Sequence, residues 1–584
     1  MKTNKKLISA VACLSLLTAT QALAGPNAGF SVTGFIQDAN LTGGVSGLNT
    51  NAGGTITVNG KQMIVPTNSI VQMPASAWSW ADLFDQTKWA PVYDPAIPAG
   101  LIPPAITTPL PAGSMGLALN DLPAVYHFPS FQVSAVGNIT VNPRNTVSPQ
   151  QYIVGLIVPA EQQGLNNHSG YINFIDYTTG RFRIGGPLGN ANCVQGNQPV
   201  GGANCPGTIV EINDPIGRYG LIHSPDQRFQ ADTSNPTVTT ATGYPVCIPR
   251  TSPGIDPFCP AFNRPLNPLA TQPGYDPFIQ PGNPLKSFTM PPVANVIAPG
   301  APGGPTPDPR LMVPLMVGDW VDVSGTIFKL DPNRLAGGNA PANQYISAYS
   351  VTANLGVKTA PGTWPAYIRV EEFLFGVGDG VGGPTVLGGV PATPITQETS
   401  TRIQLVAFTT DADVDYFGAN AKTTCTAPPD VHYPQVELYG VDASGGTWLF
   451  PDGTTLANAA TGDMCMDDPI RGRIRWQAAK HPKPGVSGLL GNATLSPEKF
   501  HREYILKLTG ATPTGGTRIA QALPASSAPA GMEPLIAGQY LMPIFEYLFA
   551  ETTGFGQPTA PYNFNDFGFL FTGPNALTPF PDFK

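Results

Sequence analysis

The sequence lacks long hydrophobic runs and is poor in charge. After the first 24 residues no segment reaches the roughly 18 apolar residues that a membrane-spanning helix needs. Charged residues make up only 12% of the 584-residue chain, and acids outnumber bases, which gives a formal net charge of −8. Nucleic-acid binding needs a cluster of Lys or Arg, and none is present. We therefore expect no transmembrane segment and no nucleic-acid partner.

Short catalytic and metal-binding motifs are missing too. The sequence contains no G-x-S-x-G elbow, no H-E-x-x-H pair and no Cys-x-x-Cys pair. It therefore offers no catalytic residue and no cofactor to predict. The 65 glycines and 65 prolines, by contrast, are far more than a helical protein tolerates. They predict many short strands joined by tight turns, and a chain of this length predicts three or more domains.

The N-terminus has the three parts of a secretory signal. Lys2, Lys5 and Lys6 precede an apolar run from Leu7 to Leu17, and a small-residue site ends at Ala24. We expect cleavage after Ala24, which takes the formal net charge from −8 to −11 because three lysines and no acid are removed. The protein is thus expected to be secreted or to reside in the cell envelope, with an unknown extracellular or cell-surface partner.

The mature chain retains six cysteines, an even number that favours disulfides in an exported protein. Six cysteines allow fifteen connectivities, and we predict the local one. It pairs Cys193 with Cys205, Cys247 with Cys259, and Cys425 with Cys465.

A short internal repeat indicates β-hairpins. GYINFIDYTTGRF (Gly170 to Phe182) aligns without gaps to GTIVEINDPIGRY (Gly207 to Tyr219), and each reads as strand, turn, strand. Gly180 and Gly217 would supply the positive φ that hairpin turns need. The related fragments VTGFI, AVGNI and VSGTI each carry a glycine within a strand pattern, which often marks the bulge that closes a small barrel. The run GDWVDVSGTIFKL (Gly318 to Leu330) resembles the first strand of an OB-like barrel.

Three segments also carry a resemblance. GTITVNGKQMIVPTNSIVQMPA (Gly54 to Ala75), GYPVCIPR (Gly243 to Arg250) and GDWVDVSGTI resemble parts of an uncharacterised group of secreted, β-rich proteins of bacteria and fungi. The first segment is also similar to small prokaryotic barrel domains of unknown function. The resemblance implies small OB-like barrels and no known activity.

The second half of the chain has different patterns. Nineteen prolines between Pro245 and Pro314 interrupt any ladder, so we expect an extended connector that packs its aromatic residues along a neighbouring surface. Between Thr401 and Gly510, four alternating segments predict an immunoglobulin-like β-sandwich. Apolar spacing from Leu541 to Phe549 predicts a short helix.

These patterns give a mainly β, multidomain fold with small OB-like barrels, an immunoglobulin-like β-sandwich and Pro/Gly-rich connectors. The expected divisions begin with a signal peptide (1–24), an N-terminal barrel with a Trp-rich insertion (25–130) and a barrel with the hairpin repeat (131–240). The stapled connector (241–312), a second OB-like barrel (313–400), the sandwich (401–512) and a C-terminal segment with the short helix (513–584) follow.

Two clusters are candidate ligand sites. Asp411, Asp413 and Asp415 have the D-x-D-x-D spacing that begins a calcium loop, but Tyr416 and Lys422 stand where an EF-hand needs glycine and a bidentate acid. A solvated loop is the main interpretation, and a structural calcium the alternative.

The second cluster is aromatic, with Trp78, Trp80 and Trp89 in one short segment. Burial in the core is the favoured interpretation, because large aromatics usually end in cores. Stacking on a sugar is the alternative. Our first hypothesis for function is a non-enzymatic secreted or cell-surface binding or structural protein acting through β-domains. A secreted hydrolase with a site assembled from distant residues and a glycan-binding module using the Trp-rich segment are the alternatives.

Overall fold

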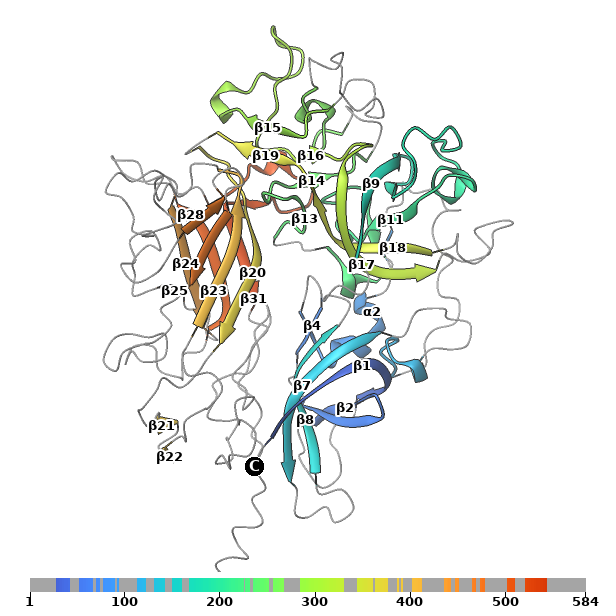
Figure 1. Cartoon of the computed structure of the whole chain (residues 1–584), viewed down its shortest axis with the longest axis vertical. Coiled ribbons are helices and arrows are strands. Elements are labelled where there is room, and N and C mark those ends of the chain that lie inside the picture. The colour runs from blue at the N-terminus through green and yellow to red at the C-terminus, as the bar shows by residue number, and fades with distance from the viewer. Residues whose placement is uncertain are drawn as a thin grey trace, which may run out of the picture.

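The structure is a computed structural model of the chain, shown in Figure 1. It describes residues 28–41, 52–66, 70–73, 77–89, 92–93, 113–121, 131–141, 150–159, 167–224, 226–231, 235–250, 256–266, 284–329, 344–360, 363–376, 386–387, 390–391, 402–411, 435–442, 447–450, 465–468, 473–477, 501–509 and 520–543. The expected signal, residues 1–24, lies outside this set. The described chain is mainly β-strand and forms several sheets, as the composition predicts.

The first unit is a five-stranded barrel. Its strands in chain order are β1 (Ala28–Leu41), β2 (Ala52–Val58), β3 (Lys61–Pro66), β7 (Gln132–Val141) and β8 (Gln150–Pro159). They lie side by side in the order β3-β2-β1-β7-β8, and β3 and β8 pair in parallel to close the barrel. This is the connectivity of an OB fold. Asn59 and Gly60, with φ of 49° and 72°, form the tight β2–β3 turn.

Short elements extend this barrel. β4 (Ile70–Gln72) adds to β8, and β5 (Ala77–Ser79) adds to β4. A 3₁₀ turn (Asp82–Phe84) and the four-residue helix α2 (Gln86–Trp89) follow.

The second barrel repeats the first. Its strands in chain order are β9 (Asn167–Asp176), β10 (Arg181–Ile184), β11 (Thr208–Ile212), β17 (Trp320–Lys329) and β18 (Gln344–Ala353). The order β11-β10-β9-β17-β18 matches that of the first barrel, and the parallel β11–β18 pair again closes it. β13 (Val238–Thr240) adds to the free edge of β18. The two OB-like barrels are thus built to one plan.

The strand pairing moves the expected domain boundaries. β7 and β8 complete the first barrel, so that barrel runs to Pro159 and crosses the division expected at residue 130. The segment 313–400 does not form a barrel of its own within its described part. β17 and β18 close the barrel begun by β9, because they pair with strands about 150 residues earlier in the chain.

Two of the three glycines predicted to mark barrel bends do so, whereas Gly34 in VTGFI lies at no register shift. Gly137 in AVGNI and Gly325 in VSGTI occupy the fourth strand of their barrels, and each lies at a register shift against the fifth strand. A Cβ at Gly137 would collide with the carbonyl oxygen of Ile153, and one at Gly325 with that of Ser347. The backbones can approach this closely only because no side chain intervenes.

The internal repeat folds only partly as expected. Gly170 to Phe182 forms the β9–β10 hairpin, with Gly180 at φ 68°. In the second copy β11 ends at Ile212, and Gly217 takes φ 66° in a turn, but Tyr219 does not join a returning strand. The prediction of a second hairpin is therefore wrong. Asp214 accepts a hydrogen bond from the Tyr219 N–H (2.5 Å) and holds the chain in a loop instead.

The third unit is an eight-stranded sandwich. One sheet has the order β20 (Ile368–Gly376), β23 (Arg402–Thr409), β27 (Arg473–Gln477), β26 (Cys465–Asp468). The other has the order β25 (Thr447–Phe450), β24 (Gln435–Asp442), β28 (His501–Thr509), β31 (Gln539–Pro543). Lettered along the chain, these are ABED and C′CFG, the immunoglobulin-like arrangement. Figure 1 shows the sandwich beside the second barrel.

Two details of this unit differ from the sequence predictions. Its first strand, β20, comes from the region assigned to a second barrel, so the sandwich begins before residue 401. Leu541 lies in strand β31, where its N–H and C=O bond the side chain of Asn235, so the predicted helix does not begin there. Residues 544–549, the rest of that prediction, lie outside the described residues.

A buried arginine joins the two barrels. The Arg228 guanidinium pairs with Asp226 (2.6 Å), donates to the carbonyl of Met115 (2.6 Å), and lies 3.9 Å from the ring centroid of Trp89. Short strands β6 (Val92–Tyr93) and β12 (His223–Ser224) pair beside it. The first barrel is therefore held to the second by the Arg228–Met115 hydrogen bond, by stacking on Trp89 and by backbone pairing, while Asp226 neutralises Arg228 from its own segment.

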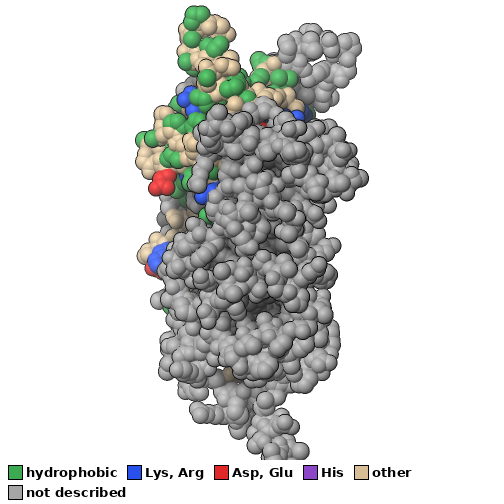
Figure 2. Space-filling model, turned by 90° about the vertical axis from the view of Figure 1, so that its left-hand side faces the viewer, with side chains coloured by type: hydrophobic (Ala, Val, Ile, Leu, Met, Phe, Trp, Pro, Cys, Tyr) green, Lys and Arg blue, Asp and Glu red, His purple; other side chains and the backbone are tan. Residues whose placement is uncertain are grey.

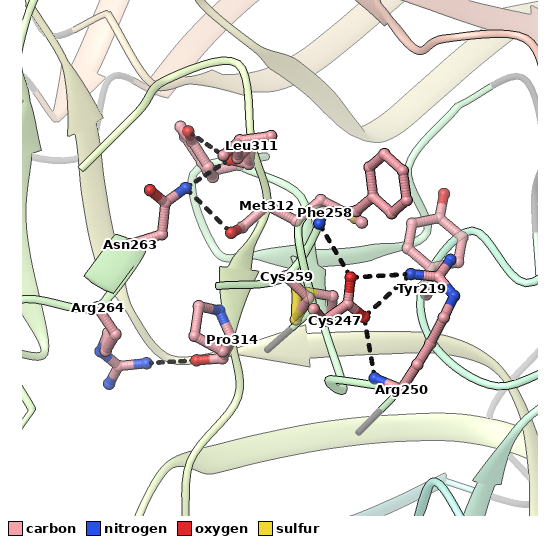
Figure 3. Close-up of a disulfide and its surroundings, with 12 residues drawn as sticks. Tyr219, Cys247, Arg250, Phe258, Cys259, Asn263, Arg264, Leu311, Met312 and Pro314 are labelled. Atoms are coloured by element: carbon pink, nitrogen blue, oxygen red, sulfur yellow. Dashed lines mark hydrogen bonds and ion pairs between the residues drawn. A yellow bond between two sulfur atoms is a disulfide. The ribbon is translucent and has the colours of Figure 1, made fainter. Parts of the chain in front are cut away.

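The described parts of the proline-rich connector are anchored to neighbouring segments. The disulfide between Cys247 and Cys259 lies at its start, surrounded by hydrogen-bonded loops (Figure 3). Its strands β14 (Val246–Cys247) and β15 (Ser287–Met290) pair in parallel with β16 (Val313–Pro314) and β19 (Gly356–Thr359). Tyr244 is fully buried and packs against Tyr367, which directly precedes the first sandwich strand, β20.

The surface near this connector is sparsely charged. Figure 2 views the molecule from the side of the sandwich and shows mainly hydrophobic and uncharged atoms on the described surface at its upper end. Isolated Lys, Arg, Asp and Glu side chains stand among them.

Two further short pairs complete the described strands: β21 (Val386–Leu387) with β22 (Val390–Pro391), and β29 (Gln521–Ala522) with β30 (Ile536–Ala537).

A second buried ion pair fixes the connector to the barrel. Arg264 and Asp319 are both about fully buried, and their side chains meet at 2.7 Å. Arg264 also donates to the carbonyl oxygens of Leu285 (2.6 Å) and Pro314 (3.3 Å). Burial, with a smaller contribution from the Asp319 charge, raises the pKa of Tyr177 to about 12. The Arg264–Asp319 pair, with the two carbonyl bonds of Arg264, thus joins the connector to the barrel.

We expect Asp319→Asn to lower the free energy of unfolding by about 3 kcal/mol or more, because it leaves a buried guanidinium without its counter-charge. Urea denaturation followed by circular dichroism measures this. The control is Asp82→Asn, whose exposed partner Lys88 loses nothing comparable. Equal midpoints for the two variants would contradict the structural role of the Arg264–Asp319 pair.

Candidate binding site on the second barrel

The Trp-rich segment lies in the core of the first barrel. Trp80 is fully buried and Trp89 is 6% exposed. Their indole N–H groups donate to the carbonyls of Asn40 (3.2 Å) and Leu83 (3.1 Å). Trp78 is half-buried and packs against the same core. The structure thus supports core burial of this segment, and the ring faces of Trp80 and Trp89 are not open to a sugar.

Two predicted disulfides are present, Cys193–Cys205 and Cys247–Cys259. Cys425 lies outside the described residues, and Cys465 is described only as part of strand β26. The third pairing therefore stays a prediction.

The acidic cluster is described only at Asp411. This residue is fully buried, and its backbone forms an isolated parallel β-bridge with Thr359. Asp413 and Asp415 lie outside the described residues, so the calcium alternative stays untested. Among the residues that the structure describes, no three His, Cys, Asp or Glu side chains gather so as to hold a metal ion. In the same part of the chain no helix is long and apolar enough to cross a membrane.

An aromatic pair stands on the outer face of the second barrel. Tyr171 on β9 and Trp320 on β17 are direct cross-strand partners and are 44% and 37% exposed. Their ring centroids lie 4.9 Å apart with planes at 86°, so the pair presents two differently oriented apolar surfaces to solvent. Exposed large aromatics in contact with each other are unusual on a soluble surface and mark contact sites.

Strand alternation explains why both rings point outward. Val321 and Val323 on β17 and Ile172 on β9 face the barrel core. Their neighbours, Trp320 and Tyr171, must then face solvent, because successive side chains of a strand point to opposite faces. The same alternation places the polar residues of both strands on the aromatic face.

Beyond the two rings, the polar residues of β9 and β17 form cross-strand pairs on the same face of the sheet. Each such pair is one row. In the next row, Ser169 donates to Asp322 Oδ1 at 2.5 Å. In the row after that, Ser324 donates to Asn167 Oδ1 at 2.6 Å. The aromatic pair and these two rows are hereafter the aromatic platform.

Neighbouring elements widen the aromatic platform. On β18, Thr352 stands opposite Asp322 and Ser350 opposite Ser324, and both are half-buried. At the aromatic end, the ammonium of Lys286 lies 5.5 Å from the Tyr171 ring centroid and donates to the carbonyl of Gly318 at 3.0 Å. The platform therefore combines ring surfaces, hydroxyls, an amide, a carboxylate and an ammonium. Figure 1 shows the strands β9, β17 and β18 that carry most of it.

This arrangement suits binding of a polar molecule with an apolar face. Among the described residues the Asp322 carboxylate accepts only the Ser169 bond, so its second oxygen can accept from a ligand hydroxyl. Tyr and Trp supply broad contact area at little cost in conformational entropy. Such side chains stack on the C–H face of a sugar ring while neighbouring polar groups bond its hydroxyls.

Sequence reasoning missed the aromatic platform. The alternation in GDWVDVSGTI does place Trp320, Asp322 and Ser324 on one face of a strand. Nothing in the sequence shows that Tyr171, about 150 positions earlier, stands beside Trp320. That neighbourhood arises only when β17 pairs with β9.

Comparisons of the chain with protein-family models, with curated proteins and with solved structures give no match. The aromatic platform is therefore interpreted from its own geometry.

Trp320→Ala should lower the free energy of unfolding by only about 1 kcal/mol, because Trp320 lies outside the core and is 37% exposed. Trp80→Ala should cost about 3 kcal/mol or more, because it empties a core position. Thermal melts of both variants measure the difference. A Trp320→Ala variant as unstable as Trp80→Ala would mean that the exposed pair is a packing element.

Proposed function

We propose that this protein is a non-enzymatic, secreted or cell-envelope binding protein whose second barrel binds carbohydrate on the aromatic platform. The observation that carries the proposal is the solvent-exposed Tyr171–Trp320 pair, continued by cross-strand rows of hydrogen-bonding side chains. OB-like barrels are known to bind oligosaccharides. The proposal keeps the glycan-binding alternative but assigns it to Tyr171 and Trp320 in place of the Trp-rich segment.

The buried acids favour binding over catalysis. Glu211, Asp226 and Asp319 each hold an arginine at 2.5 to 2.7 Å, with both partners largely out of solvent. Carboxylates used in this way are counter-ions that fix loops and junctions. This supports a scaffold that presents a surface.

The location rests on two features. The first 24 residues have the pattern of a secretory signal, and two disulfides close short loops of the second barrel and the connector. Both are compatible with an extracellular protein. The low charge and the many Gly and Pro turns suit an exposed, durable molecule, and the partner that we propose is a glycan of the cell surface or its surroundings.

The experiment uses the disulfide-bonded full mature chain on a glycan array, followed by calorimetric titration of the oligosaccharide that binds best. Trp320→Ala should weaken that affinity at least tenfold, because stacking on the indole is lost and tenfold corresponds to about 1.4 kcal/mol. Asp322→Asn should weaken it less, because the amide still accepts one hydrogen bond.

Phe35→Ala is the matched control. Phe35 is 49% exposed on β1 of the first barrel, so its loss should leave glycan affinity unchanged. Absence of any glycan ligand for the wild-type chain, or equal affinities for wild type and Trp320→Ala, would overturn the proposal.

A further inference from the structure

The long connection between β28 and β31 leaves the sandwich and packs on the second barrel unit. Leu523, Leu535 and Ala537 of this segment are buried in the core cluster of that unit. The short β29–β30 pair holds the segment as a hairpin. In an immunoglobulin-like arrangement this is the loop between strands F and G, a loop often used for recognition.

A recess lies between this segment and the second barrel unit. It is a small recess that opens to solvent. The barrel and connector side contributes two arginines. The F–G segment, residues 520–538 of the β28–β31 connection, contributes mainly apolar groups and one acid, Glu533. The lining residues that matter are Arg218, Arg310, Met312, Tyr367, Leu523 and Leu535.

Arg218 has no ion-pair partner among the described residues. Arg218 is only 7% exposed. One of its guanidinium N–H groups donates to the backbone carbonyl of Glu533 at 3.1 Å. The Nε–H group is buried and meets no acceptor in the described part of the chain. A buried cation with an open donor is costly unless a counter-charge reaches it.

Among the described residues, three other buried arginines have the counter-ion that Arg218 lacks, whereas Arg183 bonds only the carbonyls of Val200 and Gly207. Arg181, Arg228 and Arg264 each pair with a carboxylate at 2.5 to 2.7 Å. Asp214 lies near Arg218, but its carboxylate accepts from the Tyr219 N–H. Burial raises the pKa of Asp214, and the backbone N–H groups of Arg218 and Tyr219, followed by the charges of Arg250 and Arg218, oppose that rise only in part.

A second guanidinium, already paired with an acid, lines the recess beside Arg218. Arg310 is held by Asp308 through its Nε and Nη2 groups and remains one-third exposed. Its Nη1 group is not used in those bonds. Met312, Leu523 and Leu535 form apolar walls beside the two cations.

We propose that this recess binds a small organic carboxylate, with its charged end at Arg218 and its short apolar stem against Met312, Leu523 and Leu535. A carboxylate supplies the counter-charge that Arg218 lacks, and guanidinium groups bond carboxylates in well-defined geometry. The apolar walls select against a fully hydrated inorganic anion. The inference concerns a site separate from the aromatic platform and does not depend on glycan binding.

Titration with sodium butyrate tests the site, using the full mature chain at an ionic strength held constant with sodium chloride. Saturable binding is expected for the wild type, with at least tenfold weaker binding for Arg218→Gln. Ala528→Trp, which fills the recess from the F–G segment and leaves Arg218 intact, should weaken binding to the same degree. This second variant decides the matter if Arg218→Gln fails to fold.

Lys358→Gln, on β19 away from the recess, and Trp320→Ala should both bind butyrate as the wild type does. No saturable binding by the wild type, or undiminished binding by Ala528→Trp, would overturn the site. Phosphate binding more tightly than butyrate would overturn the assignment to carboxylates.

Discussion

The structure depends most on the parallel pairing of β11 with β18, which closes the second barrel. This pairing joins residues 209–212 to residues 345–348 across a long stretch of intervening chain. Once it forms, β17 must lie between β18 and β9, and the proline-rich connector must leave and return on the same side of the barrel. The β9–β17 pairing forms the aromatic platform, and the closed barrel carries the anchored connector and the docking surface for the F–G segment.

Buried arginines then fix what the closed barrel brings together. Arg228 joins the first barrel to the second, Arg264 joins the connector to the barrel, and Arg181 with Glu211 lies inside the second barrel unit. Such pairs add less stability than their Coulomb attraction suggests, because desolvation opposes it, but they restrict each junction to one geometry.

The two candidate sites use different consequences of this architecture. The aromatic platform lies on a regular sheet, where register alone sets the spacing of Tyr171, Trp320 and the polar rows. The recess lies where two units meet, and it exists because the F–G segment packs on a neighbour instead of on its own sandwich. Three β-units held rigidly together can thus present two chemically distinct surfaces at once.

The sequence by itself determined the local features of this protein. Strand alternation, glycine bulges at Gly137 and Gly325, two disulfides with short loops, and the Gly/Pro composition all act over a few residues, so they gave the mainly β class with OB-like barrels and a sandwich. Only the tertiary structure decided that residues 313–353 complete an earlier barrel, that Leu541 extends as a strand beside Asn235, and that Trp80 is core while Trp320 is surface. Those outcomes depend on pairing and burial between distant segments, which no local pattern encodes.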